Sequence, residues 1–224
     1  MNIPETESQS ISELPQIEGY EILALAGRGG MSVVYKARQL ALNRVVAIKM
    51  PHRRLILDAT AMQRLMQEGR LAVSLHHANI ATTFACSITK EGDPFLVMEF
   101  LPGQSLDELV QSQAVLDLET FRELFLQVLS GLAHAHNAGI IHRDLKPGNI
   151  LMVSGESGKL LPKIVDFGIA KLLEQKGEEQ RLTRSGAIVG SPAYMSPEQW
   201  MSQPVDRRSD IYSLGCVMYT VLTA

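Results

Sequence analysis

Oxygen-bearing side chains recur in the stretch IIHRDLKPGNIL (residues 140–151) and beyond it, and their types could support chemistry on phosphate. Asp144, Asn149 and Asp166 carry carboxylate or amide oxygens, and Lys146 lies close to the first of them. Mg²⁺ prefers oxygen ligands, and phosphoryl transfer also needs a carboxylate that orients the attacking hydroxyl. We therefore assign Asn149 and Asp166 to a metal, Asp144 to the hydroxyl and Lys146 to the charge of the moving group. A solvated loop with apolar flanks is the alternative.

The glycine-rich segment 27–35, GRGGMSVVY, lies between two predicted strands. Glycine amides that no Cβ covers can approach a phosphate chain closely, so Gly27, Arg28, Gly29 and Gly30 are candidates for a loop over a nucleotide. A glycine-rich hairpin without a ligand explains the same residues at least as well. A strand follows the segment, which disfavours a dinucleotide-binding fingerprint or a Walker A loop, because both precede a helix.

Lys49 stands within the otherwise apolar strand VVAIKM. Side chains alternate along a strand, so Lys49 shares a face with Ala47 and could lie beneath the glycine-rich loop, where a phosphate pair needs a cation. Its charge would then need a partner in the absence of phosphate, and Glu68 on the following helix is the candidate. Ordinary surface positions for both side chains are the alternative.

The apolar pattern predicts the elements that must position these residues. Short β-branched runs between residues 20 and 50 predict antiparallel strands, and PFLVMEF predicts another. Helical spacing predicts helices over residues 58–75, with Asp58 as N-cap, and over residues 117–138. Strands that come first and helices that follow favour an α+β fold with a small sheet-rich lobe and a larger helical lobe.

Bulk composition excludes several classes of protein. The net charge of −3 gives no basic footprint for nucleic acid or an anionic membrane. Two cysteines among 224 residues argue against a disulfide scaffold, and no apolar run is long enough to span a bilayer. We expect a soluble cytoplasmic protein, with residues 1–18 as a flexible leader.

Five separated motifs, GRGGMSVV, VAIK, HRDLKPGN, DFG and GSPAYMSPE, together resemble those of the eukaryotic-like (Hanks-type) serine/threonine protein kinases of bacteria, in the family's order. The resemblance runs from Tyr20 to the last residue. It implies a two-lobed fold, with an N-lobe and hinge over residues 19–101 and a C-lobe over residues 102–224. It also implies that the catalytic domain is truncated, because the family's later helices would follow the apolar helix at 211–221.

The resemblance implies roles for residues around a nucleotide. Lys49 would bind the α- and β-phosphates with Glu68 as its ion-pair partner, Asp144 and Lys146 would act in catalysis, and Asn149 and Asp166 would hold the metal. Asp107 would reach the ribose. Ser32 replaces the third glycine of the family's loop, which should alter loop mobility and leave nucleotide binding intact. The remaining nucleotide-binding positions would be Gly27, Arg28, Gly29, Gly30, Ser32, Val34, Ala47, Met98 as gatekeeper, Glu99, Leu101 and Leu151.

The resemblance also implies regulatory, docking and structural residues. Arg143 and Lys171 would face phosphates on Thr183 or Ser185, added by autophosphorylation in trans. Ser191 and Glu198 would belong to the substrate-docking segment. His142, Phe167 and Asp210 would be structural, with the His142 ring against Phe167 and Asp210 anchoring the catalytic loop.

The implied activity is transfer of the γ-phosphoryl group of ATP, with Mg²⁺ or Mn²⁺, to serine or threonine hydroxyls of proteins. An ATP-binding pseudokinase or scaffold, or an inactive kinase fragment, is the alternative, and a small-molecule phosphotransferase comes third. Self-association would serve trans-autophosphorylation, and a membrane anchor beyond the C-terminal end stays open. We expect low stability, because Glu198 would be buried without a partner and the stripe of Ile211, Leu214, Met218 and Val221 uncovered.

Overall fold

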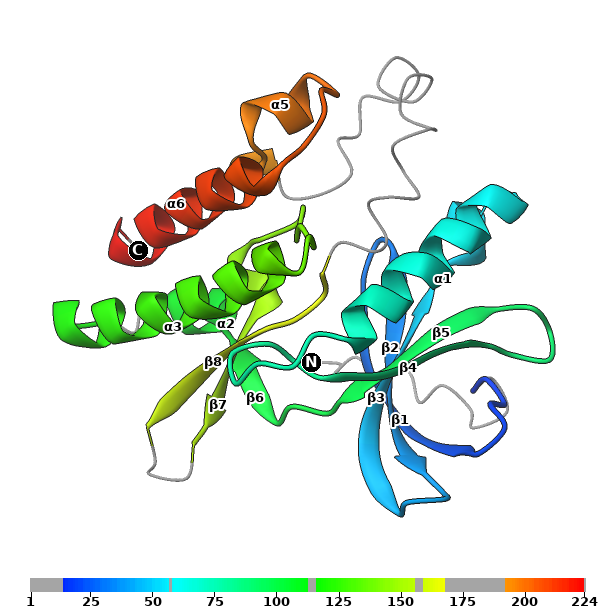
Figure 1. Ribbon diagram of the computed structural model, residues 1–224. Helices are drawn as coiled ribbons and strands as arrows, with labels where there is room; N and C mark the ends of the chain where they lie inside the picture. Colours follow the sequence, from blue (N-terminus) through cyan, green and yellow to red (C-terminus); the bar gives the residue numbers. More distant parts are fainter. Residues whose placement is uncertain (1–13, 57, 113–115, 156–158, 168–191, 224) are drawn as a thin grey trace, which may run out of the picture.

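The computed structural model describes residues 14–56, 58–112, 116–155, 159–167 and 192–223. It has two lobes, one built around a sheet and one built mainly of helices (Figure 1). The predicted α+β class and two-lobed arrangement are confirmed.

A five-stranded antiparallel sheet forms the N-lobe, in the order β1-β2-β3-β5-β4. Alternate apolar residues of these strands face one core, in which Val46 and Ile48 are fully buried. Ile17 also packs in this core and is 5% exposed, so the packed lobe begins before the predicted boundary at residue 19. The strands are β1 (Tyr20–Arg28), β2 (Ser32–Gln39), β3 (Arg44–Pro51), β4 (Thr83–Ile88) and β5 (Pro94–Glu99).

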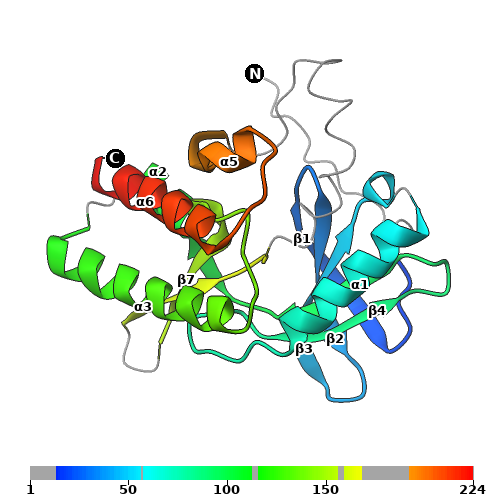
Figure 2. The same cartoon turned by 45° about the horizontal axis from the view of Figure 1, so that its top comes forward.

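A single long helix, α1 (Ala59–Val73), lies against the N-lobe sheet (Figure 2). It follows the short 3-10 turn η2 (Arg53–Leu55). The Asp58 carboxylate accepts a hydrogen bond from the Ala61 amide at 2.7 Å, as the predicted N-cap should. Gly69 allows the helix to approach β4 closely, because a Cβ there would lie 2.4 Å from the Cys86 sulfur. The approach fixes the position of Glu68, its neighbour in the chain.

A second, three-stranded sheet follows β5 in the chain, in the order β6-β7-β8. Its strands are β6 (Gly103–Ser105), β7 (Ile150–Ser154) and β8 (Leu160–Ile164), and the 3-10 turn η3 (Pro147–Asn149) leads into β7. The short helix α2 (Leu106–Gln111) starts at a capping box, in which the side chains of Ser105 and Glu108 each accept from the other's backbone amide.

The C-lobe core is formed by α3 (Leu118–Asn137) together with one side of α6 (Arg207–Thr223). The 3-10 turn η5 (Pro192–Tyr194) and the short helix α5 (Pro197–Trp200) precede α6. Phe125, Val128 and Leu132 of α3 and Val217 of α6 are almost fully buried in one cluster. Gly131 lets α3 pack tightly, since a Cβ there would lie 3.2 Å from the Asn79 carbonyl oxygen.

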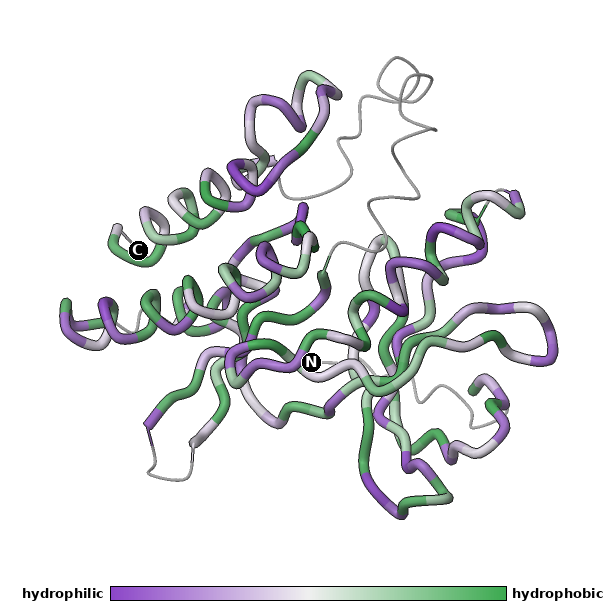
Figure 3. The backbone as a smooth tube through the Cα atoms, viewed as in Figure 1, coloured by the Kyte–Doolittle hydropathy of each residue, from purple (hydrophilic) through white to green (hydrophobic). Residues whose placement is uncertain are grey.

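The predicted exposure of the α6 stripe is wrong for most of its members. Leu214 is buried, and Met218 and Val221 pack against the C-lobe core; of the four residues only Ile211 is exposed. The exposed apolar residues of α6 are Ile211 from the stripe and, outside the stripe, Tyr212, Tyr219 and Leu222. The helix passes from hydrophilic to hydrophobic residues along its length (Figure 3). Helical spacing predicts that the residues of the stripe share one side of the helix, but it does not predict which neighbouring element covers that side.

Within the described ranges, the helices are too short or too polar to cross a membrane.

Candidate functional site

Lys49 and Asp166 come from different lobes and form an ion pair at the junction between them. Lys49 lies near the end of β3 and Asp166 just after β8, with 2.7 Å between Nζ and Oδ1. Their side chains are 13% and 30% exposed, so the pair is partly shielded from water. Both line a pocket to which Thr83, Leu96, Met98 and Phe167 also contribute. A cation and a carboxylate therefore converge at one pocket between the lobes.

The predicted ion pair between Lys49 and Glu68 is not formed. Glu68 Oε1 instead lies 3.9 Å from a terminal guanidinium nitrogen of Arg143. The helix that carries Glu68 was predicted correctly, but the placement of α1 leaves Asp166 as the carboxylate nearer to Lys49. Either Glu68 or Asp166 could neutralise Lys49, and the packing of the elements brings Asp166 into contact with it.

The catalytic-loop candidates form a compact group. Lys146 Nζ lies 3.0 Å from Asp144 Oδ2. Asn149 Nδ2 donates to the Asp144 backbone oxygen at 2.7 Å and to its Oδ2 at 3.2 Å. Pro147 starts the turn η3, which brings Asn149 back toward Asp144. The structure thus brings these three side chains together, with the carboxylate of Asp144 oriented by two neighbours.

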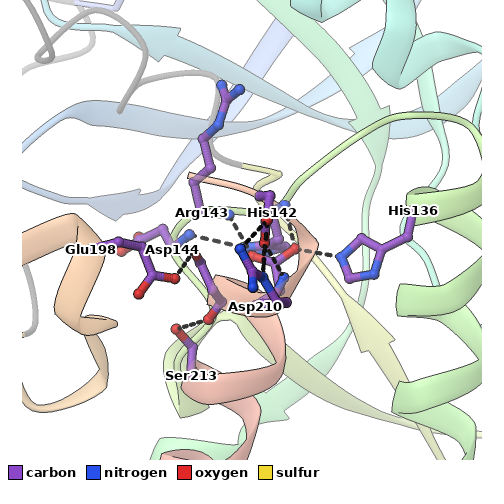
Figure 4. Close-up of polar contacts among 10 residues, drawn as sticks. His136, His142, Arg143, Asp144, Glu198, Asp210 and Ser213 are labelled. Atoms are coloured by element: carbon purple, nitrogen blue, oxygen red, sulfur yellow. Dashed lines mark hydrogen bonds and ion pairs between the residues drawn. The ribbon is translucent and has the colours of Figure 1, made fainter. Parts of the chain in front are cut away.

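Asp210 of α6 binds the backbone of the loop that carries Asp144. Its carboxylate accepts the amides of His142 and Arg143, each at 2.8 Å, and His136 Nε2 lies 2.7 Å away (Figure 4). Burial raises the pKa of Asp210, but the hydrogen bonds with His136 and with the backbone amides of His142 and Arg143 outweigh it, so the pKa is lowered overall. The carboxylate stays ionised in a buried position because donors surround it.

Arg143 and Asp166 both have left-handed backbone conformations, with φ of 65° and 62°. Aspartate adopts this conformation more readily than most residues, whereas arginine is strained there, and such strain persists only where surrounding contacts fix it. The His142 ring is fully buried, and its Nε2 is 2.9 Å from the Val165 backbone oxygen. It packs against Phe167 in a tilted arrangement, with 4.8 Å between the ring centroids. His142 thus ties the catalytic loop to the segment that carries Asp166.

Stability is expected to fall as the pH is lowered from about 7.5 to about 5.5. Burial lowers the pKa of His142, against smaller opposing effects of Asp210, Asp144 and Asp166. The folded protein therefore keeps the ring neutral while the unfolded chain takes up a proton below about pH 6.5, which favours unfolding.

The measurement is the melting temperature at the two pH values for the unmodified chain and for His142→Gln. The variant should show a flatter pH dependence. Some slope should remain, because burial also lowers the pKa of His77. Equal slopes in both proteins would contradict the prediction.

The glycine-rich loop forms the turn between β1 and β2. The Gly29 amide donates to the Ser32 backbone oxygen at 2.9 Å, and the His52 ring nitrogen lies 2.9 Å from the Gly29 oxygen. Val34 on β2 is the register partner of Lys49 on β3. The loop is therefore attached directly beside Lys49. Of the other members of this segment, Arg28 and Gly30 are exposed and Gly27 is half-buried.

The hinge candidates Met98 and Glu99 are the last two residues of β5, and Leu101 follows the strand. Met98 pairs with Ala47 across the sheet and lines the pocket, and Ala47 is buried. Leu101 and Leu151 are half-buried, in the hinge and in β7. Asp107 accepts a hydrogen bond from Gln111 within α2 at 2.8 Å.

The Glu99 side chain has a contact that the sequence did not suggest. Its carboxylate pairs with Lys163 of β8 at 2.8 Å and accepts the Thr82 amide at 3.3 Å. Nothing in the spacing of Lys163 along the chain indicated that β8 would reach Glu99. The pair ties the hinge to the strand that leads to Asp166.

The donor set suits a magnesium ion shared with phosphate. Asn149 uses its amide nitrogen toward Asp144, which leaves its amide oxygen as the acceptor, and Asp166 supplies a carboxylate. No cluster of three or more metal-ligating side chains occurs in the described part of the chain. Mg²⁺ is commonly bound by one or two carboxylates plus substrate phosphates, so a sparse oxygen set of this kind fits it.

Glu198 of α5 is not left without a partner, which corrects the expectation from the sequence. It is half-buried and accepts a hydrogen bond from the Ser209 hydroxyl of α6. That hydrogen bond lowers the pKa of Glu198. The predicted residues Lys171, Thr183, Ser185 and Ser191 lie outside the described residues.

Gln199 and His136 also contact the catalytic loop or its anchor, and the sequence reasoning missed both. Gln199 Nε2 donates to the Arg143 backbone oxygen at 2.6 Å, and His136 bonds to Asp210. The pattern Ser196-x-x-Gln199 is a capping-box signature that could have located the start of α5. No sequence signal pointed to its contact with Arg143.

Comparison with known proteins gives one consistent family. The model of the protein kinase domain matches residues 20–224. The chain is 38% identical over 204 residues to the serine/threonine-protein kinase pkn3 of Myxococcus xanthus, covering 91% of this chain and 37% of that protein. It is 37% identical over 207 residues to the serine/threonine-protein kinase PknB of Mycobacterium tuberculosis, covering 91% of this chain and 32% of that protein.

The fold is shared with a solved structure. The PknI kinase domain of Mycobacterium tuberculosis, as its C20A_R136A double mutant, superposes with a TM-score of 0.76 at 21% identity, covering 96% of this chain and 76% of that one. The chain spans about a third of the length of the curated relatives named above.

Proposed function

Because residues 20–224 match the protein kinase domain, this chain belongs to the protein kinase family, and we propose that it transfers the γ-phosphoryl group of ATP to serine or threonine hydroxyls of proteins. The observation that carries the proposal is the proximity of two groups, because the amide of Val165, next to Asp166, donates to the Asn149 backbone oxygen at 3.0 Å. One is the Lys49–Asp166 pair, and the other is the cluster of Asp144, Lys146 and Asn149. Relatives named as serine/threonine-protein kinases support the choice of acceptor.

The nucleotide would lie in the pocket between the lobes. Ala47 and Leu151 would sandwich the adenine, and the backbones of Glu99 and Leu101 would meet its polar edge. The Glu99–Lys163 ion pair at 2.8 Å supports this placement, because it restrains the hinge segment that would make those contacts. Lys49 would bind the α- and β-phosphates, under the loop attached through Val34.

Each residue of the catalytic loop would then have one task. Asp144 would accept a hydrogen bond from the substrate hydroxyl and take its proton as the hydroxyl oxygen bonds to the γ-phosphorus and the bond from that phosphorus to the departing ADP breaks. Lys146, 3.0 Å from Asp144 Oδ2, would offset charge on the transferred group. Asn149 and Asp166 would hold Mg²⁺, which when bound neutralises phosphate charge and aligns the γ-phosphoryl group. Most of the catalytic effect in such a site comes from positioning and electrostatics.

The arrangement in the structure would have to change when nucleotide binds. Asp166 now neutralises Lys49, and Glu68 lies beside Arg143. Metal and phosphate would compete for both members of the Lys49–Asp166 pair, which would free Lys49 to meet Glu68. Phosphorylation at Thr183 or Ser185 would attract Arg143 and weaken its contact with Glu68, which gives a route from activation-segment phosphorylation to the catalytic lysine.

An ATP-binding scaffold without turnover is the second candidate. The separation of Lys49 from Glu68 favours it, because catalysis in this family requires that ion pair. The presence of Lys49, Asp144, Asn149 and Asp166 favours the active kinase, and we place that function first.

Incubation of the chain with γ-labelled ATP, Mg²⁺ and a generic protein acceptor such as casein should label serine and threonine in the acceptor. Substitution Lys49→Met should reduce labelling by at least about tenfold, because phosphate binding and alignment are lost. Phosphoamino acid analysis of the acceptor is the measurement. Nucleotide binding without labelling would favour the scaffold, and labelling equal to that of Lys49→Met would contradict the proposed function.

A further inference from the structure

We propose that Gln199 is a positioning residue for catalysis, a donor on α5 that fixes the peptide immediately before Asp144. The inference rests on the proposed function, because it gives Asp144 the role of orienting the substrate hydroxyl. It adds a specific connection between that carboxylate and the short helix α5, which also carries Glu198 of the proposed substrate-docking segment.

The contact is short and lies next to the reacting carboxylate. Gln199 Nε2 donates to the Arg143 backbone oxygen at 2.6 Å, and that oxygen belongs to the peptide that joins Arg143 to Asp144. The orientation of this peptide sets the direction in which the Asp144 side chain leaves the backbone. A donor that holds the peptide therefore acts on the carboxylate without touching substrate.

Arg143 is the residue of this loop that most needs such support. Its φ of 65° is left-handed, and an arginine has no intrinsic preference for that conformation. Asp210 holds the Arg143 amide at 2.8 Å, and Gln199 holds its carbonyl. The two polar backbone groups of one strained residue are thus bound by two different helices, α6 and α5. Strained backbone persists where surrounding contacts over-determine it, and this arrangement meets that condition.

The amide of Gln199 is held in one orientation. Its Oε1 accepts from the Ser196 backbone amide at 3.2 Å and from the Ser196 hydroxyl at 3.3 Å. A backbone amide can only donate and the Arg143 carbonyl can only accept, so the oxygen must face Ser196 and the nitrogen must face Arg143. Ser196 is fully buried, which keeps water from competing for these groups.

The local role of this position does not explain why it is a glutamine. In a capping box, glutamate at N3 accepts the N-cap amide as well as glutamine does. Glutamate cannot donate, however, and its charge would lie against the lone pairs of the Arg143 carbonyl. The hydrogen bond to the Arg143 carbonyl therefore explains why this residue is a glutamine and not a glutamate. The substitution Gln199→Glu removes that donor and keeps the helix cap.

The test compares Gln199→Glu with Gln203→Glu, which makes the same charge change at an exposed residue close by. In the acceptor-labelling assay, Gln199→Glu should lower kcat by roughly 10- to 100-fold, the scale of a misplaced catalytic group, with the KM for ATP within about twofold. Its melting temperature should stay within about 2 °C of the unmodified chain, because the cap is retained. Gln203→Glu should change none of the three quantities.

A second readout does not depend on activity. Amide hydrogen exchange measured by mass spectrometry over residues 141–146 should become roughly tenfold faster in Gln199→Glu, the effect of one lost hydrogen bond on local opening, and stay unchanged in Gln203→Glu. If Gln199→Glu does not fold, Gln199→Asn keeps both amide groups on a shorter arm and should show the same changes.

The outcomes separate the inference from the proposed function. An unmodified chain that labels nothing counts against the proposed function, and exchange over residues 141–146 then decides the positioning role alone. A variant with unchanged kcat in an active protein, or with unchanged exchange in an inactive one, overturns the role of Gln199. A fall in kcat that the melting temperature fully accounts for also overturns it.

Discussion

Replacement of Asp144 by asparagine is expected to lower kcat for phosphoryl transfer by roughly 10²- to 10⁴-fold. An amide cannot take the proton of the substrate hydroxyl, and it loses the attraction of Lys146, whose Nζ lies 3.0 Å from Oδ2. The shape of the side chain is kept, and Asn149 still donates to the backbone oxygen of residue 144 at 2.7 Å. The KM for ATP should change little, because Asp144 is not among the residues proposed to bind the nucleotide.

Initial rates of acceptor labelling at several ATP concentrations provide the measurement. Asp58→Asn is the matched control, since it makes the same chemical change at an exposed N-cap, where asparagine caps as well as aspartate does. Its kcat should equal that of the unmodified chain. Equal rates for Asp144→Asn and Asp58→Asn would remove Asp144 from the mechanism.

Replacement of Asp210 by alanine is expected to destabilise the fold by about 3–5 kcal/mol, the range found when one member of a buried charged network is removed. Asp210 is 1% exposed and accepts the amides of His142 and Arg143. Alanine leaves these amides and the ring of His136 without their acceptor in a buried place. Domains of this kind are stable by only about 5–15 kcal/mol, so the loss takes a large share of the total.

Urea unfolding followed by circular dichroism would measure the loss. Asp206→Ala is the control, on an exposed carboxylate near the start of the same helix that accepts from the Arg208 amide at 2.8 Å. It should cost about 1 kcal/mol, as the loss of a helix cap does. Similar losses for the two variants would mean that the network beneath the catalytic loop contributes no more than a surface cap.

These two expectations concern different parts of one arrangement. Asp144 would act on substrate, whereas Asp210 accepts from the backbone amides of the two residues before Asp144 and contacts the His136 ring (Figure 4). A loss of stability at Asp210 should also lower activity, because the strained conformation of Arg143 depends on the amide that Asp210 accepts. Comparison of activity with the folded fraction separates the two effects.

Local features of the fold could be predicted from the sequence. The strands of the N-lobe follow β-branched runs, and α1 begins where Asp58 caps it, because alternation, helical spacing and capping depend on residues close together in the chain. The motifs also identified the residues of the catalytic loop, which the structure brings together as Asp144, Lys146 and Asn149. Short separation made this possible, since the turn at Pro147 leaves these side chains few other arrangements.

Tertiary structure alone decided which distant groups meet. Lys49 pairs with Asp166 and Glu68 approaches Arg143, although the sequence suggested that Lys49 and Glu68 would pair. Glu99 meets Lys163, and Gln199 meets Arg143, across separations in the chain that no spacing rule covers. Periodicity gives the face of a helix on which a side chain lies, but the distance between two charges depends on how whole elements pack. Because an ion pair requires contact within about 4 Å, the placement of α1 relative to β3 decides which carboxylate meets the lysine.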